Sequence, residues 1–149
     1  MNELRISTDP AELDVERIHA FLSQAYWSRG IPLDVVRRAI AGSFCFGAYI
    51  GSELIGFARA ISDGATFAYL ADVFVLEPYR GSGIAKRLVQ AALDDPRLHG
   101  LRRWLLVTRD AHGLYAGLGF TPASAPGNVM EITRRDIYLQ PAATAQVST

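Results

Sequence analysis

The chain of 149 residues contains one cysteine, Cys45, no excess of charge of either sign and no long hydrophobic run. A single cysteine excludes an internal disulfide and a cysteine-rich zinc site. Fifteen basic residues balance fifteen acidic ones, whereas proteins that bind nucleic acid normally carry a basic excess. No stretch approaches the ~18 apolar residues of a membrane span, and residues 1–10 do not resemble a secretion signal. We therefore expect no nucleic-acid partner, no membrane partner, no bound metal and a cytoplasmic location.

What the chain does have is a composition of 50% hydrophobic and 20% charged residues, which describes one compact domain. At this length folding buries roughly 70% of the surface that the unfolded chain exposes, so a core forms without disulfides. Neither a repeat nor an internal linker interrupts residues 1–139, which we predict to be a single domain. Residues 140–149 are small and polar, and we predict that they form a flexible tail.

The first third of the chain has apolar residues at helical spacing, which predicts two short helices. These residues are Val15, Ile18, Phe21 and Leu22 in the first helix, and Leu33, Val36 and Ile40 in the second. From residue 43 the pattern changes to runs of aromatic and β-branched residues. Residues 44–50, 54–61 and 66–76 are predicted to be three antiparallel strands separated by short turns.

The pattern then becomes helical from Ile84 to Ala92, and Pro96 ends this helix. Residues 104–107 are predicted to be a buried strand, residues 111–117 a short helix and residues 129–139 a final strand region. The predicted order is therefore two helices, three strands, a helix, a strand, a helix and a strand.

The most informative segment is the connection from the strand that ends near Val75 to the helix that begins at Ile84. Gly81 and Gly83 allow the backbone to approach a ligand closely, and the first turn of the helix offers unpaired amide groups that suit a phosphate. Lys86 adds a positive charge. The alternative is that the glycines serve only tight packing. A P-loop and a Rossmann fingerprint are excluded, because Gly-Lys-Ser/Thr does not follow Gly81 and no glycine or alanine stands at position 86.

Two blocks of residues resemble the GCN5-related N-acetyltransferase (GNAT) family. Arg80, Gly83 and Ala85 fit the family pattern of Arg or Gln, two residues, Gly, one residue, and Gly or Ala. A second family pattern is matched by Thr108, Ala111, Tyr115, Gly119 and Phe120, apart from Thr108, where relatives commonly have asparagine. The resemblance implies an α+β fold with a mixed, mostly antiparallel central sheet flanked by helices.

The resemblance also implies acetyl-CoA as cosubstrate. Its pyrophosphate is expected on the amides of residues 81–86 and its pantetheine along the strand at residues 73–75. Thr108 stands where relatives hold the pantetheine arm with asparagine, and its hydroxyl can replace part of that contact. The residues assigned to the cofactor are Val73, Phe74, Val75, Arg80, Gly81, Ser82, Gly83, Ile84, Ala85, Lys86 and Thr108.

The reaction that the resemblance implies is direct attack of a primary amine on the thioester in a ternary complex. An alkyl ammonium with a pKa of ~10.4 is neutral in only about one molecule per thousand at pH 7, so a carboxylate or a water chain must take its proton. An amide near Phe74 or Val75 can stabilise the oxyanion. Tyr115 stands where relatives carry a general acid that protonates the thiolate. The alternative is a tyrosine that only packs its ring.

Asp72 is the second catalytic candidate. Strand alternation places it on one face with Leu70, Phe74 and Leu76, so it is a carboxylate in apolar surroundings next to the thioester site. It either accepts the proton of the substrate, or binds its ammonium, or anchors the structure.

Tyr26, Trp27 and Arg29 lie in the loop that forms one wall of the acceptor pocket in relatives, where aromatic rings can contact an ammonium. The loop can equally fold onto its own core. An aromatic wall favours a closed pocket, and therefore the acetylation of a small-molecule amine over that of a protein or peptide.

A non-catalytic acyl-CoA-binding domain is the third alternative, and the retention of Tyr115 argues against it. An unpaired edge strand near the C-terminus would let two subunits pair as a homodimer.

Overall fold

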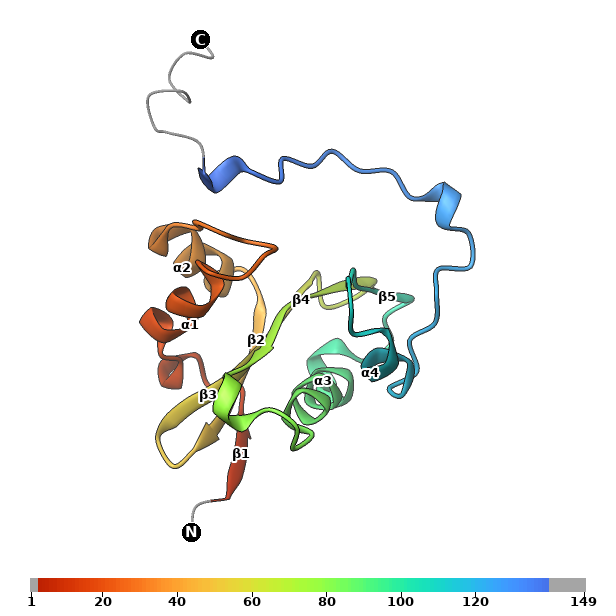
Figure 1. Cartoon of the computed structure of the whole chain (residues 1–149). Coiled ribbons are helices and arrows are strands. Elements are labelled where there is room, and N and C mark those ends of the chain that lie inside the picture. Colours follow the sequence, from red (N-terminus) through yellow and green to blue (C-terminus); the bar gives the residue numbers. More distant parts are fainter. Residues whose placement is uncertain (1–2, 140–149) are drawn as a thin grey trace.

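The computed structural model describes residues 3–139, which form a five-stranded sheet with helices on both faces (Figure 1). The strands are β1 (Leu4–Ser7), β2 (Phe44–Ile50), β3 (Glu53–Ser62), β4 (Phe67–Val75) and β5 (Arg103–Leu105). They lie in the order β1-β2-β3-β4-β5. The first four are antiparallel to their neighbours, whereas β5 is parallel to β4. The predicted α+β class with a mixed, mostly antiparallel sheet is confirmed.

Four helices flank the sheet, and each overlaps a segment that the sequence predicts to be helical. They are α1 (Val15–Leu22), α2 (Leu33–Ala41), α3 (Ile84–Asp94) and α4 (His112–Ala116). Ile18 and Val36 pack with Phe57 and Phe74 on one face of the sheet, while Leu88 of α3 packs on the other face. Burial of such side chains stabilises the fold by about 1.5–3 kcal/mol each. None of the described helices is long and apolar enough to cross a membrane.

The two ends of the chain differ from the prediction. Residues 4–7 form β1, which the polar start of the sequence did not suggest, because the strand depends on pairing with distant β2. Residues 129–139 were predicted to be a strand region, and this is wrong for the described chain, where no neighbouring strand pairs with them. We call residues 121–139 the arm; it contains only two short 3-10 turns, Pro126–Asn128 and Ile137–Leu139. The predicted flexible tail, residues 140–149, lies outside the described residues.

Candidate active site

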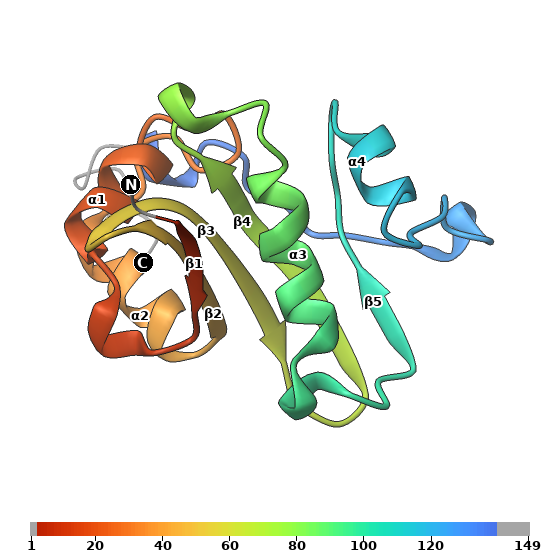
Figure 2. The same cartoon turned by 90° about the horizontal axis from the view of Figure 1, so that it is seen from below.

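The parallel strands β4 and β5 separate soon after they meet. They pair only through Phe67 with Arg103, Ala68 with Trp104, and Tyr69 with Leu105. Beyond Tyr69, β4 continues to Val75, while the chain after β5 diverges toward α4 (Figure 2). Within residues 3–139, the edge of residues 70–75 that faces β5 therefore has no strand neighbour. Backbone donors and acceptors on such an edge remain free for a ligand.

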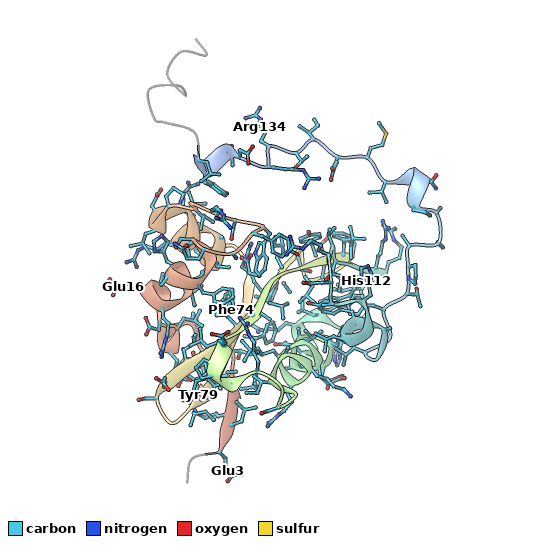
Figure 3. The ribbon with its side chains drawn as sticks, viewed as in Figure 1. Glu3, Glu16, Phe74, Tyr79, His112 and Arg134 are labelled. Carbon is cyan, nitrogen blue, oxygen red and sulfur yellow. The ribbon has the colours of Figure 1, made fainter. Side chains whose placement is uncertain are left out.

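A cavity of about 1300 Å³ lies at this separation. Its walls are β4, the turn before α3, the segment from residue 106 through α4, the α1–α2 loop and part of the arm. Of the predicted site residues, the lining includes Tyr26, Trp27, Asp72, Val73, Phe74, Val75, Arg80, Gly81, Gly83, Ile84, Ala85, Lys86, Thr108 and Tyr115. Arg29 and Ser82 are exposed and do not line the cavity. In Figure 3, Phe74 lies inside the molecule and Arg134 lies on the arm above it.

The glycine turn has the conformation that an anion site needs. Gly81 and Gly83 have φ values of +84° and +77°, and nothing lies within 4 Å of a Cβ built on either residue. The two glycines therefore do not serve close packing; they give the backbone a left-handed conformation that L side chains disfavour. Gly83 caps α3 without a side-chain hydrogen bond, so the first amides of this helix have no side-chain partner. Such amides and the helix dipole favour a phosphate group.

Arg80 holds this turn against the end of β4. Its Nε donates a hydrogen bond to the carbonyl oxygen of Val75 at 2.8 Å. The family motif predicts Arg80 to bind the cofactor, and the structure places it beside the glycine turn. Its observed contact is with the protein backbone, so part of its guanidinium fixes the distance between the glycine turn and the open edge of β4.

A β-bulge changes the direction of β4 inside the cavity. Arg59 pairs with Ala71 and Phe57 with Phe74, so Asp72 and Val73 together face the single residue Ala58. Asp72 has φ +56°, a left-handed conformation that is rare outside glycine.

Because of the bulge, the side chains of β4 do not alternate between the two faces as the sequence predicts. Leu70 pairs with Ala60, whose side chain lies in the core on the α3 face. Phe74 instead stacks on Phe21 of α1, with ring centroids 4.0 Å apart. The expectation that Asp72 shares one face with both Leu70 and Phe74 is therefore wrong, because the extra residue reverses the alternation.

The carboxylate of Asp72 bridges two other segments. Its Oδ1 accepts a hydrogen bond from Nε1 of Trp27 at 2.9 Å. Its Oδ2 lies 2.9 Å from both Nε and Nη2 of Arg59. The side chains of Arg59 and Asp72 are only 14% and 10% exposed, so this ion pair is largely shielded from water. Sequence reasoning missed Arg59, although a lone charged residue within an apolar strand was an available signal.

Trp27, which donates to Asp72, forms an aromatic wall of the cavity together with Tyr26. Tyr26 meets Trp27 edge to face at 5.1 Å between ring centroids. The guanidinium carbon of Arg109 lies 3.7 Å from the centroid of the Tyr26 ring, in cation–π geometry. The α1–α2 loop and the segment before α4 therefore touch, and they close one side of the cavity. Both rings remain nearly half exposed, so the loop does not simply fold onto the core.

Tyr115 belongs to α4, which Thr108 helps to hold in place. The hydroxyl oxygen of Thr108 accepts a hydrogen bond from the backbone N–H of Ala111 at 3.0 Å, so its O–H remains as a donor. Burial raises the pKa of Tyr115, and the neighbouring Tyr26 and Asp110 raise it further. The phenol therefore stays protonated and able to donate a proton at neutral and moderately alkaline pH.

Comparisons with known proteins agree with this geometry. The model of the Acetyltransferase (GNAT) family matches residues 12–120. A Gibberella zeae protein named as an acetyltransferase is 35% identical over 133 residues, and the match covers 74% of each chain.

Two solved structures have the same fold. A crystal structure of a GNAT acetyltransferase from Xanthomonas campestris pv. campestris is 49% identical, with a TM-score of 0.90 over 94% of this chain and 99% of that one. An acetyltransferase of Clostridium acetobutylicum, crystallised with acetyl-CoA, is 15% identical, with a TM-score of 0.63 over 89% of this chain and 96% of that one. At this identity the second likeness concerns the fold alone. The matched sequence, the separated strands and the glycine turn agree: the chain belongs to the GNAT family of acetyltransferases.

Proposed function

We propose that the protein is an acetyl-CoA-dependent N-acetyltransferase that acetylates the primary amine of a small molecule. The observation that carries this proposal is the cavity itself, which places the open edge of β4, the glycine turn and the phenol of Tyr115 around one space. The open edge of β4 suits a long ligand, the glycine turn suits an anionic pyrophosphate, and the phenol of Tyr115 suits a reactive thioester. Acetyl-CoA combines these three properties.

The residues of the cavity fit acetyl-CoA. The backbone edge at residues 73–75 has no strand neighbour and suits the amide groups of pantetheine, apart from the carbonyl oxygen of Val75, which already accepts from Arg80. The amides of residues 81–86 with Lys86 suit the pyrophosphate. The open space around Gly81 and Gly83 supports this fit, because a ligand can approach the backbone there. When bound, acetyl-CoA supplies an acyl group activated as a thioester.

Residues of the chain then meet the demands of the reaction. A backbone amide at Phe74 or Val75 stabilises the negative charge that develops on the carbonyl oxygen. As the C–N bond forms and the C–S bond breaks, Tyr115 donates its proton to the leaving sulfur, and the proton that the nitrogen loses on becoming an amide returns through water to the tyrosinate. The proton of the substrate ammonium leaves before attack, and we assign its removal to water in the open cavity.

We assign Asp72 the role of a positioning residue rather than that of the base. Its oxygens already accept two hydrogen bonds, one from Trp27 and one from Arg59, and form an ion pair with the Arg59 guanidinium, so little of the carboxylate remains for a substrate proton. Trp27 thereby keeps a fixed orientation in the wall where an acceptor amine would enter. The contact between Arg109 and Tyr26 narrows the side of the cavity where the acceptor would enter, which supports a small acceptor over a peptide.

The first test is a thermal melt with and without acetyl-CoA, with NADH as the control ligand. A ligand at 100 times its Kd adds ~2.7 kcal/mol of stability, and each kcal/mol raises the Tm of a domain of this size by roughly 2–4 °C. We expect stabilisation by acetyl-CoA alone. No shift, or a shift with NADH alone, would overturn the cofactor assignment.

The second test is thiol release from acetyl-CoA in the presence of a panel of small amines and of lysine-containing peptides. We expect release with a subset of the small amines and none with the peptides. Turnover of peptides alone would favour a protein or peptide acetyltransferase. Stabilisation by acetyl-CoA without release in any case would indicate an acyl-CoA-binding domain.

A further inference from the structure

Tyr69 of β4 lies at the point where the two parallel strands separate. It is the last residue of β4 that pairs with β5, where its partner is Leu105, and it lines the cavity. On its other side it pairs with Ile61 of β3, which also lines the cavity and is 41% exposed. Tyr69 therefore stands where the open edge of β4 begins.

The side chain of Tyr69 faces the side of the sheet that carries α1 and α2. Successive residues of a strand point to opposite faces, and antiparallel partners point to the same face. Ala60 lies in the core on the α3 face, so Ile61 and its partner Tyr69 point to the other face. The glycine turn opens α3, whereas the aromatic wall belongs to the α1–α2 loop. Tyr69 is therefore on the face of the acceptor and not on that of the pyrophosphate.

The charged side chains next to Tyr69 are already occupied by other groups of the protein. Arg59 donates through Nε to Oδ2 of Asp72, and through Nη1 to Oγ of Ser43 at 3.0 Å. The hydroxyl of Ser43 in turn donates to the carbonyl oxygen of Ala39 at 2.7 Å. The hydroxyl of Tyr69 takes no part in this network, and it forms no other hydrogen bond within residues 3–139. It is therefore available to a ligand in the cavity.

The surroundings of Tyr69 keep its phenol neutral. The side chain is half-buried, and burial raises the pKa of the phenol; the carboxylate of Asp72 raises it further, while Arg59 acts in the opposite direction. A free carboxylate beside an amine would stabilise the ammonium form, whereas a neutral oxygen can accept an N–H bond without doing so. Only the neutral amine attacks a thioester, and it is the minor form at pH 7. A phenol therefore suits the reactive form of the acceptor better than a free carboxylate would.

We propose that Tyr69 is an acceptor-binding residue, whose hydroxyl oxygen accepts a hydrogen bond from an N–H group of the neutral primary amine. This bond orients the nitrogen so that its lone pair faces the thioester carbon. Tyr69 keeps its own proton throughout, so the proton transfers assigned to water and to Tyr115 are unchanged. The assignment rests on the proposed function, because it requires an amine acceptor.

Tyr69→Phe tests this role, because it removes the hydroxyl and keeps the ring. With the small primary amines that the wild type accepts, we expect kcat/KM for the amine to fall at least tenfold. The Kd for acetyl-CoA, measured by calorimetric titration, and the Tm should stay at their wild-type values. Tyr49→Phe is the matched control, because Tyr49 packs on the same face of the sheet but lies outside the cavity lining. It should keep wild-type kinetics.

The possible results separate the role of Tyr69 from the proposed function. A wild-type kcat/KM in Tyr69→Phe would overturn the role of Tyr69 and leave the proposed function intact. A parallel loss of affinity for acetyl-CoA would also overturn it, because the hydroxyl would then act on the cofactor or on the fold. If the wild type releases thiol with no amine of the panel, the proposed function fails, and the role of Tyr69 fails with it.

The pH profile distinguishes binding from proton transfer. We expect Tyr69→Phe to keep the alkaline decline in turnover that deprotonation of Tyr115 causes, at a lower kcat/KM throughout. Loss of this decline in Tyr69→Phe would make Tyr69 the proton donor, and its assignment as a hydrogen-bond acceptor for the amine would be overturned.

Discussion

The two halves of the sheet each contain a β-bulge, and the two bulges serve different purposes. In the β2–β3 half, the register shifts at Ala48, which leaves Ile55 as the extra residue. Ile55 is fully buried, and its carbonyl oxygen accepts a hydrogen bond from the N–H of Leu76 at 2.8 Å. In the β4–β5 half, the bulge lies on the side of β4 that pairs with β3, and it includes Asp72, which lines the cavity.

The difference shows how one sheet separates stability from function. Every residue of β2 pairs with β3, and Phe46, Ala48 and Phe57 of these two strands are fully buried. Strands β4 and β5 pair over three residues and then part around the cavity. We call the β2–β3 half the closed half and the β4–β5 half the open half. The closed half supplies the packing that allows the open half to leave backbone groups unpaired for a ligand. The variants below test whether the two halves can be altered independently.

The largest effect is expected at Tyr115. Tyr115→Phe keeps the ring packed on Phe120 and removes only the hydroxyl, so turnover should fall by about 10²–10⁴-fold while the affinity for acetyl-CoA is unchanged. The pKa of Tyr115 is raised, so the acid form persists as the pH rises and is lost only above ~10. We expect wild-type turnover to decline in that alkaline range and the variant to lack the decline. Steady-state kinetics against pH measures both, and unchanged turnover would remove Tyr115 as the acid.

The next largest effect is expected at the glycine turn. Gly83→Val places a β-branched residue at φ +77° and adds a Cβ where a ligand would approach, so the Kd for acetyl-CoA should rise at least tenfold. Calorimetric titration measures this affinity.

Gly100 provides the matched control, because it has φ +79°, equally open space and no place in the cavity lining. Both Gly83→Val and Gly100→Val should lose ~1–2 kcal/mol of stability from backbone strain. Only Gly83→Val should lose affinity. An equal loss of affinity in both variants would mean that strain, and not the site, is responsible.

The difference between the closed and open halves of the sheet also explains which features the sequence could predict. In the closed half, helix and strand patterns depend on the spacing of neighbouring apolar residues, so α1, α2 and the β2–β3 hairpin were predicted close to their observed bounds. The glycine turn was found because its motif is continuous in sequence. Strand β1 was missed because its polar sequence becomes a strand only through pairing with β2, some forty residues away.

The open half holds what the sequence could not show. No residue type by itself predicts a bulge. The alternation of apolar residues therefore could not predict that the side chains of β4 change sides of the sheet at Asp72. The bridge from Trp27 through Asp72 to Arg59 joins three segments that only the folded chain brings together. The arm was predicted to be a strand from its composition, but a strand also needs a neighbour, which the described chain does not provide.

A smaller effect, on the acceptor side alone, is expected at Trp27. Trp27→Phe removes the donor to Asp72 but keeps the Arg59–Asp72 ion pair, so the KM for the amine should rise about 3–10-fold with kcat nearly unchanged, which corresponds to ~1 kcal/mol for one hydrogen bond. Asp72→Asn should give a similar rise in KM together with a loss of stability, because Arg59 is left with an uncharged partner.

The two variants separate positioning from catalysis. If Asp72 were the base, Asp72→Asn would reduce kcat by orders of magnitude and change the acidic side of the pH profile, whereas Trp27→Phe would not. Steady-state kinetics of both variants across pH, with urea unfolding as the measure of stability, therefore distinguishes the two roles.

The smallest effect is expected in the closed half, at Tyr49 of β2. Its hydroxyl is buried and has no hydrogen-bond partner in the described chain, and burial raises the pKa of this phenol to about 12. Removing an unsatisfied buried group relieves its desolvation cost, so Tyr49→Phe should leave stability unchanged or raise it by up to ~1 kcal/mol. Turnover and the Kd for acetyl-CoA should match the wild type, because Tyr49 lies outside the cavity lining. A loss of activity with stability retained would show that the closed half communicates with the site, and the division of the sheet into two independent halves would then fail.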